Sequence, residues 1–190
     1  MDDMTRTKLS ADTILDHAAA LITAGEPLTF STLARALGSR SQALYNYYPN
    51  QAALTDALCA RNLHWLVPRL QKALFGLSGR AALTQLALTC RTSGLAHFRL
   101  TQFTLAHVHQ DNAPATAGAM TDLRTLINQL IQSTPADAAT QIVGERMLRN
   151  LIVGEIFNVG TGWFDDPAMS AEESFRQMVD QCLAPLFPEQ

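Results

Sequence analysis

Apolar residues recur every three or four positions along most of the chain, which is the spacing that lines one face of an α-helix. Near the N-terminus, Ile14, Leu15 and Ala18 follow this spacing, and Ser10 precedes them at the position of a helix N-cap. Short groups of Gly, Pro, Ser and Asn interrupt the pattern, with no internal repeat. The pattern predicts one helix between Ser10 and Gly25 and further helices over residues 30–37, 41–48, 51–75, 80–92, 95–109, 115–133, 136–160 and 170–186.

Two of these helices, at 30–37 and 41–48, are short and are separated by a turn that contains Gly38. Leu33 and Leu44 lie where they would pack the two helices against each other. This layout is that of a helix-turn-helix. The second helix then presents a polar and aromatic set that could meet base edges and phosphates, although a solvated helix face would show the same residue types. The set consists of Ser41, Gln42, Tyr45 and Asn46.

The same stretch carries a longer motif. It reads T-x-S-x-L-A-x-x-L-G over Thr29–Gly38, then A-L-Y-N-Y-Y-P-N-Q over Ala43–Gln51, then Ala53-Leu54. In its spacing, its turn glycine and its aromatic cluster, this segment resembles the N-terminal region of the tetracycline-repressor (TetR/AcrR-type) family of transcriptional regulators. The resemblance implies that the chain binds double-stranded operator DNA, as a repressor that a small molecule releases from a palindromic operator.

The resemblance also implies which residues contact DNA, by matching family positions one by one. Tyr48 is expected in the core, and Tyr45 could serve either the core or DNA. Gln42 and Asn46 could each bond adenine N6 and N7 through their amides. Gln51 stands where the family usually places a phosphate-binding lysine, so one cationic contact is missing. The implied DNA-binding residues are Thr29, Ser31, Ser41, Gln42, Ala43, Tyr45, Asn46, Tyr47 (through its hydroxyl, to phosphate) and Gln51.

The C-terminal region resembles the same family more weakly. Leu148–Phe164 and the motif S-x-E-E-S-F-R-Q-M-V at Ser170–Val179 are similar to the last two helices of many members, which pair across a two-fold axis. A homodimer through the two C-terminal helices is therefore implied. Gly154 in mid-helix costs about 1 kcal/mol relative to Ala. A close helix–helix approach would explain it, either at the dimer seam or inside the monomer.

An unidentified small-molecule effector is implied as well, bound in a mostly apolar pocket with a few placed polar groups. The pocket would be lined by helices between about residues 80 and 164. For each candidate, an ordinary place in the core or on the surface is an equal alternative. The candidates are His97, Phe98, Gln102, Phe103, His107, Arg146, Met147, Asn150, Phe157 and Trp163.

The composition agrees with a helical chain, because aromatic residues make up only 7% while Ala and Leu are abundant. We expect an all-α fold of two domains. Residues 1–55 would form a three-helix, helix-turn-helix DNA-binding domain, and residues 56–190 a larger helical domain for ligand binding and dimerisation. The boundary falls inside the long helix predicted at 51–75, so the connection between the domains would be rigid.

The formal net charge of −3 does not by itself favour nucleic-acid binding. Within residues 5–61, however, five basic side chains stand against four acidic ones, a balance of +1. The basic residues are Arg6, Lys8, Arg35, Arg40 and Arg61, and the acidic residues are Asp12, Asp16, Glu26 and Asp56. The charge distribution therefore permits DNA binding without indicating it.

Cysteine usage and hydropathy point to a cytoplasmic protein. Cys59, Cys90 and Cys182 are odd in number and widely spaced, which argues against a disulfide framework or a zinc site and favours a reducing compartment. The chain shows no signal-peptide pattern and no stretch near the roughly 20 apolar residues of a membrane span. We therefore expect no membrane association.

Motifs for enzymes and metals are absent. The sequence has no G-x-x-x-x-G-K-[ST], G-x-G-x-x-G, H-E-x-x-H or G-x-S-x-G, so we expect no enzyme activity and no cofactor. His107 and His109 point about 200° apart on a helix, and His107 with Asp111 would supply only two ligands, so no metal site is expected. The alternative function is a helical ligand-binding or protein-interaction module with weakened DNA binding.

Overall fold

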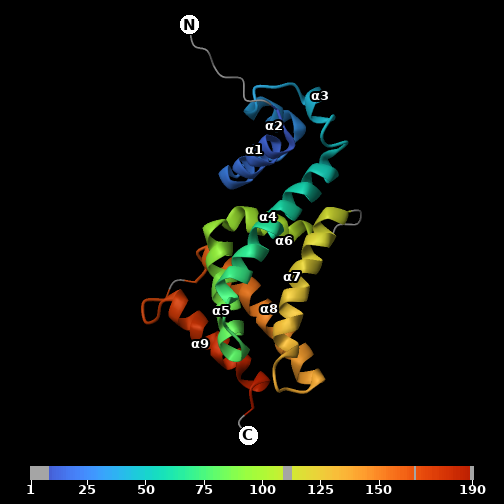
Figure 1. Cartoon of the computed structure of the whole chain (residues 1–190). Coiled ribbons are helices and arrows are strands. Elements are labelled where there is room, and N and C mark those ends of the chain that lie inside the picture. The colour runs from blue at the N-terminus through green and yellow to red at the C-terminus, as the bar shows by residue number, and fades with distance from the viewer. Residues whose placement is uncertain (1–8, 109–112, 165, 189–190) are drawn as a thin grey trace. The chain divides into compact units, whose positions relative to one another are not determined.

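The computed structural model describes residues 9–108, 113–164 and 166–188, and every regular element formed by these residues is a helix (Figure 1). The all-α fold class is therefore confirmed. The chain divides into two compact units, one of Met1–Asn62 with Arg99–Gly118 and one of Leu63–Phe98 with Ala119–Gln190. This division differs from the expected one at residue 55, because a segment far along the chain joins the N-terminal unit.

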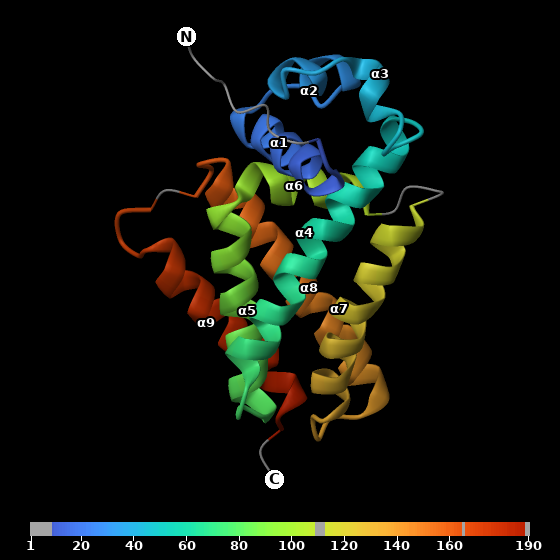
Figure 2. The same ribbon diagram turned by 45° about the horizontal axis from the view of Figure 1, so that its top comes forward.

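The first unit contains α1 (Ala11–Ala24), α2 (Phe30–Ala36), α3 (Ser41–Leu44), the first half of α4 (Gln51–Leu74) and nearly all of α6 (Phe98–His107). Leu100 and Phe103 bring α6 against its core, beside α1 and α4 (Figure 2). The buried residues of this core are Ile14, Leu15, Ala18, Phe30, Leu33, Ala34, Leu44, Tyr48, Leu54 and Leu58.

Local signals start and stop the short helices as the sequence predicts. The Ser10 side chain accepts a hydrogen bond from the Thr13 amide at 3.1 Å and begins α1. At the end of α2, Gly38 adopts a left-handed φ of 60°, which lets its amide reach the Arg35 carbonyl and the Ser39 amide reach the Ala34 carbonyl. This pair of bonds closes the helix in a Schellman motif. The chain is thereby turned from α2 into α3.

The third helix is shorter than predicted. Regular α3 ends at Leu44 rather than at Tyr48, although the amides of Tyr47 and Tyr48 both still donate to the Leu44 carbonyl at 3.0 Å. The residue before a proline is disfavoured in the α conformation, so Pro49 explains why the helix cannot run on through Tyr48. Tyr48 is buried, as expected.

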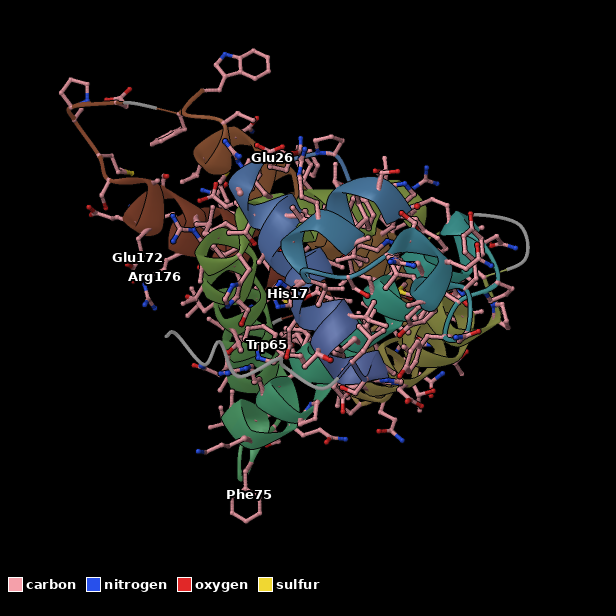
Figure 3. The ribbon with its side chains drawn as sticks, turned by 90° about the horizontal axis from the view of Figure 1, so that it is seen from above. His17, Glu26, Trp65, Phe75, Glu172 and Arg176 are labelled. Carbon is pink, nitrogen blue, oxygen red and sulfur yellow. The ribbon has the colours of Figure 1, made fainter. Side chains whose placement is uncertain are left out.

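The second unit consists of longer helices. It contains the second half of α4, α5 (Gly79–Ala96), most of α7 (Pro114–Gln132), α8 (Ala138–Gly160), α9 (Ala171–Leu183) and the 3-10 turn η1 (Ala184–Leu186). The helices α5, α8 and α9 pack against one another around an apolar core that includes Leu86, Leu148 and Phe175. Phe75, directly after α4, points away from the ribbon (Figure 3).

The predicted break at Ser93-Gly94 is wrong, because α5 continues to Ala96. A Cβ atom at Gly94 would lie 2.5 Å from Ile156 Cδ1 of α8. The glycine therefore serves a close approach of two helices and does not end one. None of the helices formed by the described residues combines the length and the apolar character of a membrane span.

Candidate nucleic-acid interface

The surface of α3 and of the turn that follows it is polar. Gln42 and Asn46 are exposed, while Leu44 between them is fully buried. Tyr45 remains 51% exposed although its ring packs edge-on against Phe30, with ring centroids 4.7 Å apart. Packing and outward exposure thus occur together at Tyr45. We call Gln42, Tyr45 and Asn46 the reading face.

The other matched positions around α2 and α3 differ in how free their side chains are. Ser31 is exposed, whereas Ala43 is half-buried. Ser41 is half-buried as well, and its hydroxyl donates to the Phe30 carbonyl at 3.4 Å. The Thr29 hydroxyl accepts from the Thr32 amide at 3.1 Å as the N-cap of α2. The hydroxyls of Ser41 and Thr29 are therefore engaged in local structure, in addition to any contact they make with DNA.

Tyr47 and Gln51 both have partners within the protein. Tyr47 is 40% exposed, and its hydroxyl donates to the Leu9 carbonyl at 2.8 Å. The Gln51 amide nitrogen donates to the Leu28 carbonyl at 2.8 Å. A hydroxyl carries one hydrogen, so Tyr47 cannot donate to a phosphate while this bond persists. Each of these side chains fixes a segment that precedes a helix of the first unit.

Arg61 holds α1 against α4. Its guanidinium forms an ion pair with Asp16 at 2.7 Å and donates to the Leu15 carbonyl at 2.6 Å. Arg61 is one of the five basic residues counted in positions 5–61, and these contacts pair its charge within the protein. They also fix the helix that follows the reading face.

Two basic residues next to the reading face were not among the residues matched to DNA contacts. Arg35 lies in the last turn of α2 and Arg40 at the N-cap position of α3, and both are exposed. Arg35 and Arg40 are the two Lys or Arg residues in positions 28–58. Their charge in this stretch is the sequence signal that marks them as candidate phosphate contacts. Neither arginine is a residue of the matched motif, so the resemblance assigns no DNA contact to them.

The candidate pocket residues do not form one cluster within either unit. Phe98 and Phe157 meet edge-on at 6.0 Å in the second unit, and Phe103 and His107 meet at 4.3 Å in the first. The His107 Nδ1 atom lies 2.7 Å from the Phe103 carbonyl oxygen.

The remaining candidates are mostly exposed. His97 packs edge-on against Trp65 at 4.9 Å, and Trp163 is 84% exposed. Four further pocket candidates are exposed, Gln102 on α6 and Arg146, Met147 and Asn150 on α8. A shared lining role is therefore not evident from the positions of these residues.

The described residues contain no group of three or more His, Cys, Asp or Glu side chains placed to hold a metal ion. His109 and Asp111, which the sequence pairs with His107, lie outside the described residues.

No family model and no curated protein matches the sequence. Solved structures do match. A protein of unknown function from Rhodococcus sp. RHA1 has a TM-score of 0.79 at 17% identity, over 95% of this chain and 97% of that one. A TetR variant from Acinetobacter baumannii AYE in complex with minocycline has a TM-score of 0.66 at 20% identity, over 93% of this chain and 95% of that one. A TetR family transcription regulator from Marinobacter aquaeolei VT8 has a TM-score of 0.66 at 16% identity, over 90% of this chain and 92% of that one.

Proposed function

We propose that this chain, which has the all-helical fold of the TetR-type regulators, is a DNA-binding transcription regulator and not an enzyme. It acts as a homodimeric repressor that a small molecule releases from a palindromic operator. The observation that carries the proposal is the reading face, an exposed surface of α3 and the turn after it, between whose residues Leu44 is fully buried.

Gln42 and Asn46 are the base-reading residues in this proposal. They lie four positions apart, and the chain stays turned beyond α3 because the Tyr47 and Tyr48 amides both donate to the Leu44 carbonyl. Each side-chain amide offers one donor and one acceptor, which suits the N6 and N7 atoms of adenine in the major groove.

Arg35 and Arg40 take over the phosphate contacts that a lysine at position 51 would make. Two phosphate contacts per protomer give four in a dimer. Since each contact contributes about −0.9 to the dependence of log K on log[salt], the expected slope is only about −4. A binding titration at several salt concentrations measures this slope.

A second copy of the chain is the expected partner of α8. Val143, Met147, Asn150 and Gly154 recur at alternating spacings of four and three along this helix, and Val143 and Met147 are 56% and 47% exposed. A Cβ atom at Gly154 would meet nothing within 4 Å, which favours the dimer seam over packing inside the monomer. Two reading faces on one side of DNA must also lie about 34–36 Å apart, which a dimer provides.

Light scattering tests this interface, with a mass twice the 20.7 kDa of the chain as the expected result. Met147→Glu should shift the protein toward monomer, because it places a charge in an apolar seam. Leu77→Glu, at an exposed leucine outside α8, is the matched control and should leave the mass unchanged. A monomeric wild-type protein would contradict the palindromic-operator mechanism.

The effector in this proposal is a small, largely apolar molecule bound by the helical body, where Phe98 and Phe157 already pair. The coupling between effector and operator is expected at about 1–3 kcal/mol, roughly five- to 150-fold in affinity. A thermal-shift screen followed by a DNA-release assay tests it. If every stabilising compound leaves DNA binding unchanged, the sensing half of the proposal fails.

The double variant Gln42→Ala, Asn46→Ala is the direct test of DNA reading. It should remove about 1–3 kcal/mol of base discrimination for each good bidentate contact, with stability changed by no more than about 0.5 kcal/mol. The matched control is Asn128→Ala, Gln132→Ala, an exposed amide pair with the same spacing on α7. Unchanged preference for operator over scrambled DNA would favour the alternative, a helical ligand-binding or interaction module with weakened DNA binding.

A further inference from the structure

Among the residues that the structure describes, two helix ends in the first unit have no charged residue within their own terminal turn. The first turn of α7 holds no acidic side chain, and the last turn of α1 holds no basic one. At the start of α7, Ala113 occupies the N-cap position, because its carbonyl accepts from the Ala117 amide. An alanine side chain cannot cap the free amides of a helix N-terminus.

Asp56 of α4 supplies the missing cap from another helix. Its carboxylate accepts from the Thr116 amide at 2.8 Å and from the Ala115 amide at 3.1 Å. The Thr116 hydroxyl donates to the Asp56 carbonyl at 3.1 Å, and Thr116 is buried. These amides belong to the second and third residues of α7, the two positions that an N-cap side chain normally satisfies. The negative charge also suits the positive end of the helix dipole.

Arg99 of α6 plays the matching part at the C-terminus of α1. Its guanidinium donates to the Thr23 carbonyl at 3.5 Å and lies against Gly25, where an added Cβ atom would collide with it. A cation is favourable at the negative end of a helix. Between these two contacts, the Asn62 amide donates to the buried Thr104 hydroxyl at 2.9 Å. The segment 99–118 is therefore bonded to α1 and α4 at three points.

We propose that Asp56 and Arg99 are positioning residues for the reading face. Because Asp56 caps α7 from α4, DNA affinity depends on the position of the first turn of α7 relative to α4. The inference rests on the proposed function and names a regulatory contact for the same site. Asp56 lies only 12 residues beyond Leu44, on the helix that follows the reading face. A displacement of the first turn of α7 breaks two hydrogen bonds to α4 and frees α4 to move.

The test separates a positioning role from a purely stabilising one by moving the cap. Asp56→Ala removes it, whereas the double variant Asp56→Ala, Ala113→Asp gives α7 an N-cap within its own chain segment. Asp56→Ala in the full chain should lower affinity for the duplex that the wild-type protein selects from a randomised pool. The expected loss is roughly two- to thirtyfold, the range for one helix cap. Asp122→Ala, at an exposed carboxylate of α7, is the control and should change nothing.

The double variant should regain the melting temperature and the slow hydrogen exchange of the Ala115 and Thr116 amides, while its DNA affinity stays low. Recovery of affinity together with stability would overturn the proposal, because Asp56 would then be only a cap. Arg99→Gln should show a smaller loss of affinity, roughly two- to fivefold, against Arg124→Gln as the exposed control.

Hydrogen exchange without DNA distinguishes this inference from the proposed function. If the wild-type protein selects no duplex, the proposed function fails, but the tether is still tested. Asp56→Ala and the double variant should both speed exchange at the Tyr47 and Tyr48 amides, which bond to Leu44. Unchanged exchange at these two amides in both variants would overturn the inference whatever the DNA result.

Discussion

The two units of the molecule are stabilised in different ways. In the first unit, short helices are fixed by side chains that reach distant backbone groups, as Arg61 does at Leu15 and Gln51 does at Leu28. In the second unit, long helices pack through apolar side chains, with one largely buried ion pair between Arg91 and Glu155 among the residues that the structure describes.

The exposed surfaces of the two units also differ, one being polar and the other apolar. The reading face of the first unit is polar and aromatic, whereas α8 of the second unit exposes Val143 and Met147. In the proposed function the reading face meets DNA and must stay polar, so its short helix has little apolar area with which to hold its position. Bonds to the backbone then supply the rigidity. In the proposed dimer the exposed face of α8 meets a second copy of the chain and can be apolar, because association buries it.

The largest expected effect is in the second unit. Arg91 and Glu155 pair at 2.7 Å with side chains 11% and 4% exposed. Arg91→Ala leaves a buried carboxylate uncompensated and should reduce the free energy of unfolding by about 3–5 kcal/mol. Arg176→Ala, which breaks the exposed pair with Glu172, is the control and should change stability little (Figure 3). Urea denaturation measures both, and equal effects would contradict the assignment of Arg91–Glu155 as a core interaction.

Leu44→Ala tests the apolar side of the first unit. Leu44 is fully buried, so the variant should lose about 2–5 kcal/mol of stability and, with it, binding to every DNA sequence. Leu77→Ala, at an exposed leucine, is the matched control. Melting curves and duplex binding at one salt concentration provide the measurement. A stable Leu44→Ala protein would mean that the backbone bonds alone hold α3.

Tyr47→Phe tests the polar side of the same unit. Loss of the bond to the Leu9 carbonyl should cost about 0.5–1.5 kcal/mol of stability. Tyr45→Phe is the control, because no hydrogen bond of its hydroxyl is observed among the described residues, and it should leave stability unchanged. If Tyr47 instead serves phosphate contact, its variant will bind all duplexes more weakly with an unchanged melting temperature.

The cysteines provide the smallest and most local comparison. Burial raises the pKa of the Cys59 thiol to about 12 in the first unit and that of Cys90 to about 12 in the second. Thiolate is therefore scarce at pH 8, and iodoacetamide should label the native protein far more slowly than the urea-unfolded one. Because these folded-state values are raised, the thiols favour the folded state less as pH rises above about 9. Rapid labelling of the fully buried Cys59 or of the partly buried Cys90 in the native protein would show local opening.

The sequence by itself determined the features that depend on neighbours within about five residues. The Ser10 cap, the Gly38 turn and the burial of Leu44 and Tyr48 all match the prediction. A capping side chain bonds an amide three residues on, and helical spacing repeats within one turn, so a short window of sequence contains both partners.

Only the tertiary structure decided the features whose partners are far along the chain. Tyr47 bonds to a residue 38 positions away, Gln51 to one 23 away and Asp56 to one 60 away. The contact of Asp56 bonds the start of α7 to the first unit, and the other two give a structural role to two residues expected to contact DNA. Gly94 is likewise explained only by Ile156 of another helix, where the sequence alone suggested a helix break. A local window cannot predict such pairs, because the entropy of closing the intervening loop is offset only by the packing of the complete fold.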